Sequence, residues 1–457
     1  MFSTQTYIER RNALKRTVGS GLILIMGNEE APMNYHDNTY RYRQDSSFLY
    51  YFGISLANLA AIIDVDSGEE IIYGDEFSMD DIIWVGPQPT LADQSRRVGV
   101  YRTEAYSKLA DKLGKAKKVH FTPPYRYENK FKLSTWLNIP IAQLKENASV
   151  DLIKAIVNQR SYKSAEEIVQ MEEAVNITRD MHIAAMRETR AGRKEYEIAA
   201  LLHQKAREGG GDLAYPIIFS INGQTLHNHY HGNTMIAGKL ALNDSGAENS
   251  MFYAGDITRT IPVSKKFTEQ QKEIYNLVLQ MQLTSIEALK PGTLYKDVHL
   301  LANRVLLEGL TSLGFVKGNV DDMLAEGVQG LFMPHGLGHA IGLDVHDMED
   351  LGENYVGYRE GLERSTQLGL KSLRLAKELE TGFVVTVEPG LYFIPELIDK
   401  WKAENRFTDF INYDLLEKYK DFGGVRIEDN CLITDTGYKV LGKPIPKTVQ
   451  EVEDLKN

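Results

Sequence analysis

Three of the chain's eleven histidines lie in the run HGLGHAIGLDVHD, which begins at residue 335. His335 and His339 are four residues apart, the spacing of a helical zinc motif of the H-E-x-x-H kind. However, no glutamate follows His335, and each interior glycine would cost a helix about 1 kcal/mol relative to alanine. We therefore expect glycine-rich turns and extended chain here. The histidines, including His346, then belong to another kind of site.

Four carboxylates lie in strand-like sequence elsewhere. Asp244 and Asp256 belong to LALNDSGAENSMFYAGDITRT, Glu388 to GFVVTVEPGLYF and Glu428 to GGVRIEDNCLIT. Taken singly, such residues usually lie in water at a strand end, because a buried carboxylate must be paired or bind a cation. Four of them with one histidine supply the ligands that two divalent ions need. Dominant oxygen ligation favours manganese, with cobalt(II) or zinc as alternatives, and argues against a thiolate zinc site.

An internal repeat places these carboxylates in two similar halves. Residues 190–208 and 290–308 register at an offset of 100, which pairs Gly192 with Gly292. A helix opened by a capping box precedes each segment, and strand-like sequence follows each. A helix–turn–helix followed by strands, present twice, predicts two halves about a pseudo-two-fold axis. The alternative is a chance similarity of two amphipathic helices.

The N-terminal third has a different pattern. Its apolar runs GLILIMG, LAAIIDV and EIIYG alternate with helical or loop sequence, which predicts a mixed α/β domain. Ser164 and Glu167 then form a capping box that begins a helix. We place the domain boundary just before this helix, close to residue 158, with a first domain at residues 1–158 and a second at 159–457.

The composition is that of a globular protein. The chain has 457 residues, of which 43% are apolar and 25% charged. Its net charge of −11 disfavours nucleic acid and anionic membranes as partners. The apolar run LILIM (22–26) is far too short to span a membrane, and MFSTQTYIERRN has charges where a signal peptide needs apolar residues. With Cys431 as the single cysteine, no internal disulfide can form, and we expect a cytoplasmic protein.

The strings DSGAE…AGDITRT, HGLGHAIGLDVHD, TVEPGLY and GVRIED resemble the signature of the pita-bread metallopeptidases. Within that family they are most similar to the Xaa-Pro aminopeptidases (aminopeptidase P) and their relatives, the Xaa-Pro dipeptidases (prolidases). YRYRQDSSFLYYFGI (40–54) resembles the non-catalytic domain of both, so the resemblance covers nearly the whole chain. It implies an α+β fold: a C-terminal pita-bread domain, with internally duplicated helices over a curved antiparallel sheet, after an N-terminal mixed α/β domain.

The resemblance also implies a role for individual residues. The implied ligands of two divalent metal ions are Asp244, Asp256, His339, Glu388 and Glu428. The implied catalytic residues are Glu388, His227, His335, His346 and Arg426. Glu388 would carry a proton, and His335 and His346 would hydrogen-bond the substrate. His229 and His231 remain alternatives to His227, because no spacing argument separates the three.

The implied activity is hydrolysis of the bond between an N-terminal residue and a following proline by a hydroxide that bridges the metals. The substrates would be peptides with proline at the second position, and a homo-oligomer, dimer or tetramer, is expected. An Xaa-Pro dipeptidase is the alternative. A catalytically inactive binding module is a remote one, because all five ligands are present. Two inserts, residues 355–380 and 394–422, flank Glu388, and we expect both to line or cover the mouth of the site.

Overall fold

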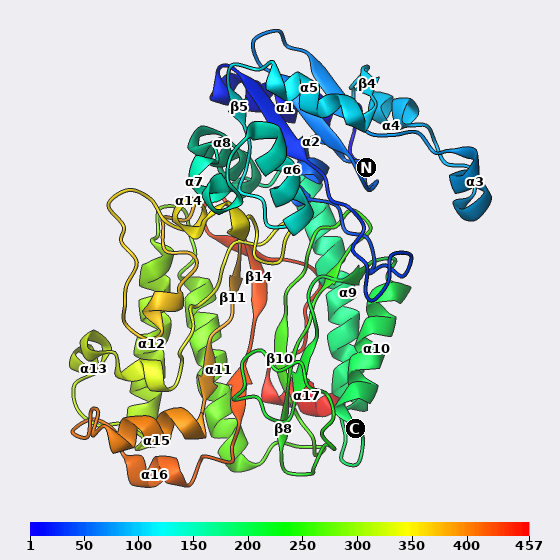
Figure 1. Ribbon diagram of the computed structural model, residues 1–457. Coiled ribbons are helices and arrows are strands. Elements are labelled where there is room, and N and C mark those ends of the chain that lie inside the picture. Colours follow the sequence, from blue (N-terminus) through cyan, green and yellow to red (C-terminus); the bar gives the residue numbers. More distant parts are fainter. Residues whose placement is uncertain (457) are drawn as a thin grey trace. The chain divides into compact units, whose positions relative to one another are not determined.

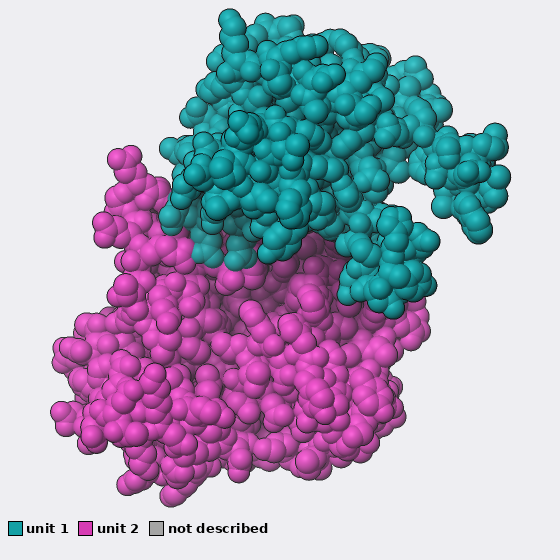
Figure 2. Space-filling model, in the orientation of Figure 1, with its two compact units in different colours: residues 1–160, 348–355 teal, residues 161–347, 356–457 magenta. Residues whose placement is uncertain are grey.

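A computed structural model describes residues 1–456 of the chain, which form two compact units (Figure 2). The N-terminal unit consists of residues 1–160 and 348–355, and the C-terminal unit of residues 161–347 and the chain from 356 onward. No helix among the described residues is long and apolar enough to cross a membrane.

The N-terminal unit contains a five-stranded sheet in the order β4-β3-β2-β1-β5 (Figure 1). The three predicted apolar runs form β1 (Leu22–Met26), β2 (Ala60–Asp64) and β3 (Glu70–Tyr73), which pair antiparallel. The edge strand β4 (Thr103–Glu104) pairs parallel with β3, and the edge strand β5 (Val119–His120) pairs parallel with β1. With its helices, this sheet forms the mixed α/β domain that was predicted. Its helices are α1 (Thr4–Val18), α2 (Ser46–Phe52), α3 (Met79–Val85), α4 (Leu91–Arg97), α5 (Leu109–Gly114), α6 (Tyr127–Leu137), α7 (Leu144–Asn147), α8 (Val150–Ser161) and α14 (Glu353–Val356).

The C-terminal unit contains two helix pairs, which confirm the internal repeat. These are α9 (Ala165–Glu188) with α10 (Glu195–Glu208), and α11 (Glu269–Glu287) with α12 (Tyr295–Ser312). Capping boxes open α9 and α11, as predicted. Gly192 and Gly292 both have positive φ, 89° and 83°, a conformation that favours glycine at the turn within each pair.

The strands of this unit lie between the helix pairs in Figure 1 and are all antiparallel. One sheet has the order β10-β8-β7 and its counterpart the order β11-β14-β15; two ribbons, β12-β13 and β6-β9, complete the set. The strands are β6 (Asp212–Leu213), β7 (Ile218–Ser220), β8 (Leu240–Asp244), β9 (Ala247–Glu248), β10 (Thr258–Pro262), β11 (Val384–Val387), β12 (Gly390–Tyr392), β13 (Gly424–Arg426), β14 (Asp429–Ile433) and β15 (Tyr438–Val440).

One apolar core joins the helix pairs to the sheets and fixes where the strand ends lie. It contains Leu202 of α10, Leu306 of α12, Val385 of β11 and Val425 of β13, each fully buried. The remaining helices of the unit are α13 (Val320–Glu326), α15 (Pro395–Ala403), α16 (Tyr413–Glu417) and α17 (Val449–Asp454). The second insert forms α15 and α16, and its Trp401 belongs to the same core.

Candidate metal centre

The four predicted carboxylates all lie at strand ends. Asp244 is the last residue of β8, Asp256 precedes β10, Glu388 follows β11, and Glu428 lies between β13 and β14. In the β8–β10 register Asp244 faces Thr258, whose carbonyl oxygen accepts a hydrogen bond of 3.0 Å from the amide of Glu428. The first and second halves of the repeat therefore meet at these carboxylates.

The run HGLGHAIGLDVHD is not helical, as expected. His339 pairs with β11 through its amide, which donates to Thr386 Oγ1 at 3.0 Å, and through its carbonyl oxygen, which accepts from the Thr386 amide at 2.9 Å. A Cβ atom on Gly338 would lie 2.2 Å from the carbonyl oxygen of Thr386. Glycine is thus needed for the close approach that brings His339 beside Glu388.

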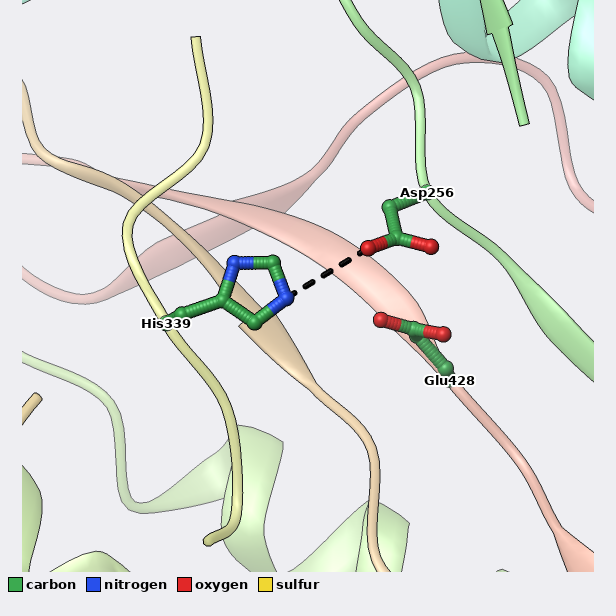
Figure 3. Close-up of side chains that lie close together, drawn as sticks. All are labelled: Asp256, His339 and Glu428. Carbon is green, nitrogen blue, oxygen red and sulfur yellow. Dashed lines mark ion pairs between the residues drawn. The ribbon is translucent and has the colours of Figure 1, made fainter. Parts of the chain in front are cut away.

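Figure 3 shows Asp256, His339 and Glu428 pointing toward one another, with one ligand atom of each within 4.8 Å of the other two. His339 Nε2 lies 3.4 Å from Asp256 Oδ2 and 3.3 Å from Glu388 Oε1. His339 Nδ1 donates to the carbonyl oxygen of Ala340 at 3.1 Å, which leaves Nε2 facing the carboxylates. Histidines that bind metals are typically oriented in this way.

The charges of the cluster are strongly coupled. Burial, together with the charge of Asp256, raises the pKa of Asp244 to about 6, although Arg426 opposes the shift. Burial and the neighbouring carboxylates raise the pKa of Glu428 well above its ordinary value. So many acidic groups in one buried place favour uptake of positive charge, whether protons or cations.

His339 and Glu388 form an ion pair with each other. Burial disfavours the charged imidazole, but hydrogen bonds to Asp256 and Glu388 outweigh it and raise the pKa of His339 to about 10. Burial likewise opposes ionisation of Glu388, yet the hydrogen bond and charge of His339 lower its pKa to about 2.

One atom of the cluster tests whether a metal fits here. Glu428 Oε2 accepts a hydrogen bond of 2.7 Å from Thr258 Oγ1. Glu428 Oε1 is also buried, yet no group among the described residues hydrogen-bonds it. A buried carboxylate oxygen without a donor is costly, and a divalent cation would satisfy it. The donor set of four carboxylates and one imidazole suits such an ion.

Tyr215 is a site residue that sequence reasoning missed, because a single tyrosine in the string DLAYPI has the pattern of a core residue. Its hydroxyl is 2.7 Å from Asp244 Oδ1 and also contacts Asp256 Oδ1. Burial and these carboxylates raise the pKa of the phenol well above 10, so it keeps its hydrogen. With one hydrogen it donates to one carboxylate at a time.

Arg426 is hydrogen-bonded on all three nitrogens. Nη2 donates to Asp244 Oδ2 at 2.5 Å, Nη1 to the Tyr392 hydroxyl at 2.7 Å, and Nε to Thr258 Oγ1 at 3.2 Å. Tyr392 was also missed, although it lies only four residues after Glu388 in the motif VEPGLY.

Both ring nitrogens of His335 have partners. Nδ1 donates to the carbonyl oxygen of Gly336 at 2.7 Å, and Nε2 lies 3.0 Å from the Tyr392 hydroxyl. Burial, reinforced by the charge of Arg426, lowers the pKa of His335 to about 4. The neutral ring therefore accepts at Nε2, and it can donate to another group from Nε2 only after gaining a proton.

Every predicted site residue lines one cavity of about 540 Å³ in the C-terminal unit. The ring of His346 lies edge-on to that of His339, with 4.2 Å between centroids. His227 and His229 both line the cavity, whereas His231 Nε2 lies 3.1 Å from the Ile217 carbonyl oxygen.

The two inserts contribute unequally to the wall. The first supplies Ser372 and Arg374, and the second supplies none of the described residues that line the cavity. The second insert therefore does not line the cavity, because the apolar residues of α15 and α16 pack into the core.

Comparisons with known proteins agree with this geometry. Residues 169–435 match the model of metallopeptidase family M24, and residues 7–121 match that of the aminopeptidase P N-terminal domain. The chain is 32% identical to Xaa-Pro dipeptidase of Homo sapiens (98% of this chain, 91% of the relative). It is 33% identical to a probable Xaa-Pro aminopeptidase of Verticillium alfalfae (95% and 92%).

Two solved structures confirm the pita-bread fold. Aminopeptidase PepP of Pseudomonas aeruginosa superposes with a TM-score of 0.82 at 27% identity, over 99% of this chain and 98% of that one. Aminopeptidase P of Escherichia coli, solved in complex with substrate, superposes with a TM-score of 0.81 at 30% identity, over the same shares. The chain belongs to metallopeptidase family M24.

Proposed function

We propose that the chain is an Xaa-Pro aminopeptidase that hydrolyses the bond between an N-terminal residue and a following proline. The observation that carries the proposal is the convergence of five ligand residues on one cavity that imidazoles also line. The structural neighbours named aminopeptidase P and the fungal relatives named Xaa-Pro aminopeptidase support it. The substrates are then peptides with proline at the second position.

Asp244, Asp256, His339, Glu388 and Glu428 would together hold two divalent cations. A cation held there would satisfy the unpartnered oxygen of Glu428. Such cations would supply a water molecule of lowered pKa as the nucleophile and would polarise the scissile carbonyl. Oxygen-rich ligation favours manganese over cobalt or zinc.

Glu388 moves the proton. It lies on the cavity wall, where Thr386 Oγ1 donates to its Oε1 at 3.3 Å and orients the carboxylate. It accepts a proton from the attacking water and delivers it to the prolyl nitrogen as that nitrogen leaves. The bond to Thr386 keeps one oxygen fixed while the other handles the proton.

The imidazoles bind the substrate. His346 and His335 hydrogen-bond the scissile carbonyl and the oxyanion that develops from it. Because neutral His335 accepts from Tyr392, it donates as the imidazolium, which the negative charge of the oxyanion favours. Arg426 holds Asp244 and Tyr392 in place, and His227 contacts the substrate at the cavity wall.

Proline sets the specificity through its backbone. Its amide is tertiary, so a peptidase that needs an N–H donor from that residue cannot bind it. A cavity that fits the pyrrolidine ring has no such requirement.

Two observations favour a dipeptidase as the second candidate. The mammalian relatives are named Xaa-Pro dipeptidase. In addition, Arg374 lines the cavity, and a guanidinium is well suited to bind the C-terminal carboxylate of a dipeptide.

Hydrolysis of Ala-Pro and Ala-Pro-Ala by the manganese-loaded chain tests both candidates. An aminopeptidase cleaves the tripeptide at least as well as the dipeptide. Cleavage of Ala-Pro alone would identify a dipeptidase, and Arg374→Ala should then raise KM for that substrate. If the metal-loaded chain cleaves neither peptide, both proposals fail.

A further inference from the structure

The segment that carries His346 has no helix or strand to hold it. Its beginning is fixed to β11, where the amide of Ile341 donates to the carbonyl oxygen of Val384 at 3.1 Å. The chain then turns back, and the amide of Asp347 donates to the carbonyl oxygen of Ala340 at 2.9 Å. The residue that follows His346 is therefore tied to the start of the segment.

A buried ion pair holds Asp347. Lys163 Nζ lies 2.9 Å from Asp347 Oδ2, and the two side chains are only 2% and 1% exposed. Lys163 is itself anchored, because it directly precedes the N-cap of α9 and its amide donates to the carbonyl oxygen of Gly382 at 2.8 Å. The pair thus connects the first helix of the C-terminal unit to the residue after His346.

A neighbouring glycine leaves room for this pair. A Cβ atom on Gly342 would lie 2.5 Å from Asp347 Oδ2 and 2.9 Å from Lys163 Cε. The amide of Ala254 donates to the Gly342 carbonyl oxygen at 2.8 Å, so the backbone cannot easily withdraw. Because φ of Gly342 is not positive, space is the reason for glycine here.

Stability alone does not account for the pair. Replacing a buried ion pair with uncharged groups of similar volume is often neutral or stabilising, whereas removing one partner is strongly destabilising. What a buried pair supplies is a fixed distance and direction between two segments.

We propose that the Lys163–Asp347 pair is a positioning device that holds His346 against His339 at the geometry that catalysis needs. The inference rests on the proposed contact of His346 with substrate.

A double-mutant cycle in the full-length, manganese-loaded chain tests the proposal. The variant Lys163→Met/Asp347→Asn removes both charges and keeps similar shapes. With Ala-Pro-Ala or Ala-Pro as substrate, whichever the chain cleaves, kcat should fall about tenfold or more, because small misplacements of a catalytic group cost that much. Metal content should stay at the wild-type level. His346→Ala should then lower kcat much less in this background than in the wild type.

Two comparisons separate positioning from loss of folding. Arg11→Met/Glu70→Gln removes an ion pair of the N-terminal unit between a buried arginine and a partly buried glutamate, whose Nε–Oε2 distance is 2.7 Å. This variant should lower Tm and leave kcat within twofold. Gly342→Ala keeps both charges but displaces them, and it should show the same coupling to His346→Ala. Gly437→Ala is its control, because nothing lies within 4 Å of the added Cβ.

Three results bear against the proposal in different ways. Unchanged kcat in both the charge-removed variant and Gly342→Ala would overturn it. The proposal would also be overturned if the kcat losses of these variants multiply with the kcat loss of His346→Ala, because the effects of independent sites add in free energy. If His346→Ala itself leaves kcat unchanged, the substrate contact assigned to His346 fails and the inference fails with it, while the metal ligands and the peptidase activity stand.

Discussion

The hydroxyl of Tyr215 lies 2.7 Å from a carboxylate oxygen of Asp244 and touches Asp256 as well, so one phenol contacts two of the proposed metal ligands. Partners of this kind orient the ligands, and their loss typically costs about 10- to 100-fold in metal affinity. This contact predicts that Tyr215 affects the affinity for the cations more than the affinity for the substrate.

Tyr215→Phe should therefore weaken manganese binding about tenfold or more, measured by calorimetric titration of the metal-free chain. At saturating manganese, KM for the peptide should change little. Tyr253→Phe is a matched control: that hydroxyl is also buried and donates to a carboxylate, Glu167, outside the proposed ligand set. Equal manganese affinity of Tyr215→Phe and wild type would show that the contact is only structural.

Glu388→Gln should nearly abolish turnover, because it removes both a ligand charge and the proposed proton carrier. Loss of a general acid–base group typically costs about a hundredfold or more. Glu380→Gln, at a glutamate shortly before β11 that accepts a hydrogen bond from Tyr162, should keep near wild-type kcat. A Glu388→Gln variant that retains more than about a tenth of the wild-type rate would contradict the assigned role.

The three histidines of the opening run should respond differently to alanine. His339→Ala should lower metal content, because it deletes a ligand. His335→Ala and His346→Ala should keep the metal and lower kcat about a hundredfold, or about 3 kcal/mol, the usual cost of one oxyanion donor. Metal analysis, Tm and kcat on all three variants decide the matter. If His335→Ala or His346→Ala loses the metal while His339→Ala keeps it, the ligand assignment is wrong.

Much of the fold was predictable because its signals are local. The capping boxes at Ser164 and Thr268 predict where α9 and α11 begin, and the offset of 100 between Gly192 and Gly292 predicts the duplication. Apolar runs likewise predict the three central strands of the N-terminal sheet. The capping boxes and the apolar runs are set by residues close together in the chain, and the duplication is visible because two segments repeat one local pattern.

The parts of the site that escaped prediction depend on residues far apart in the chain. Tyr215 reaches Asp256 across 41 positions, and Lys163 reaches Asp347 across 184. Nothing near Lys163 in the sequence marks its side chain as buried, because an isolated lysine usually lies in water. Only the assembled unit brings Tyr215 to the carboxylates and Lys163 to Asp347.

The raised pKa of Glu428 predicts how the metal-free chain depends on pH. Burial and the surrounding carboxylates stabilise its protonated form in the folded state. A carboxyl whose folded pKa exceeds its unfolded value adds stability at low pH and loses that contribution as pH rises through the folded pKa. The Tm of the chelator-treated chain should thus decline as pH rises toward the raised pKa of Glu428, and the Tm of Glu428→Gln should decline less over the same range.

Added manganese should raise the Tm of the wild type, because the cations bind only the folded state. It should raise the Tm of Glu428→Gln much less. Glu326→Gln, at an exposed position, should behave as wild type in both respects. An equal decline of Tm with rising pH in Glu428→Gln and wild type would show that this carboxyl does not cause the pH dependence.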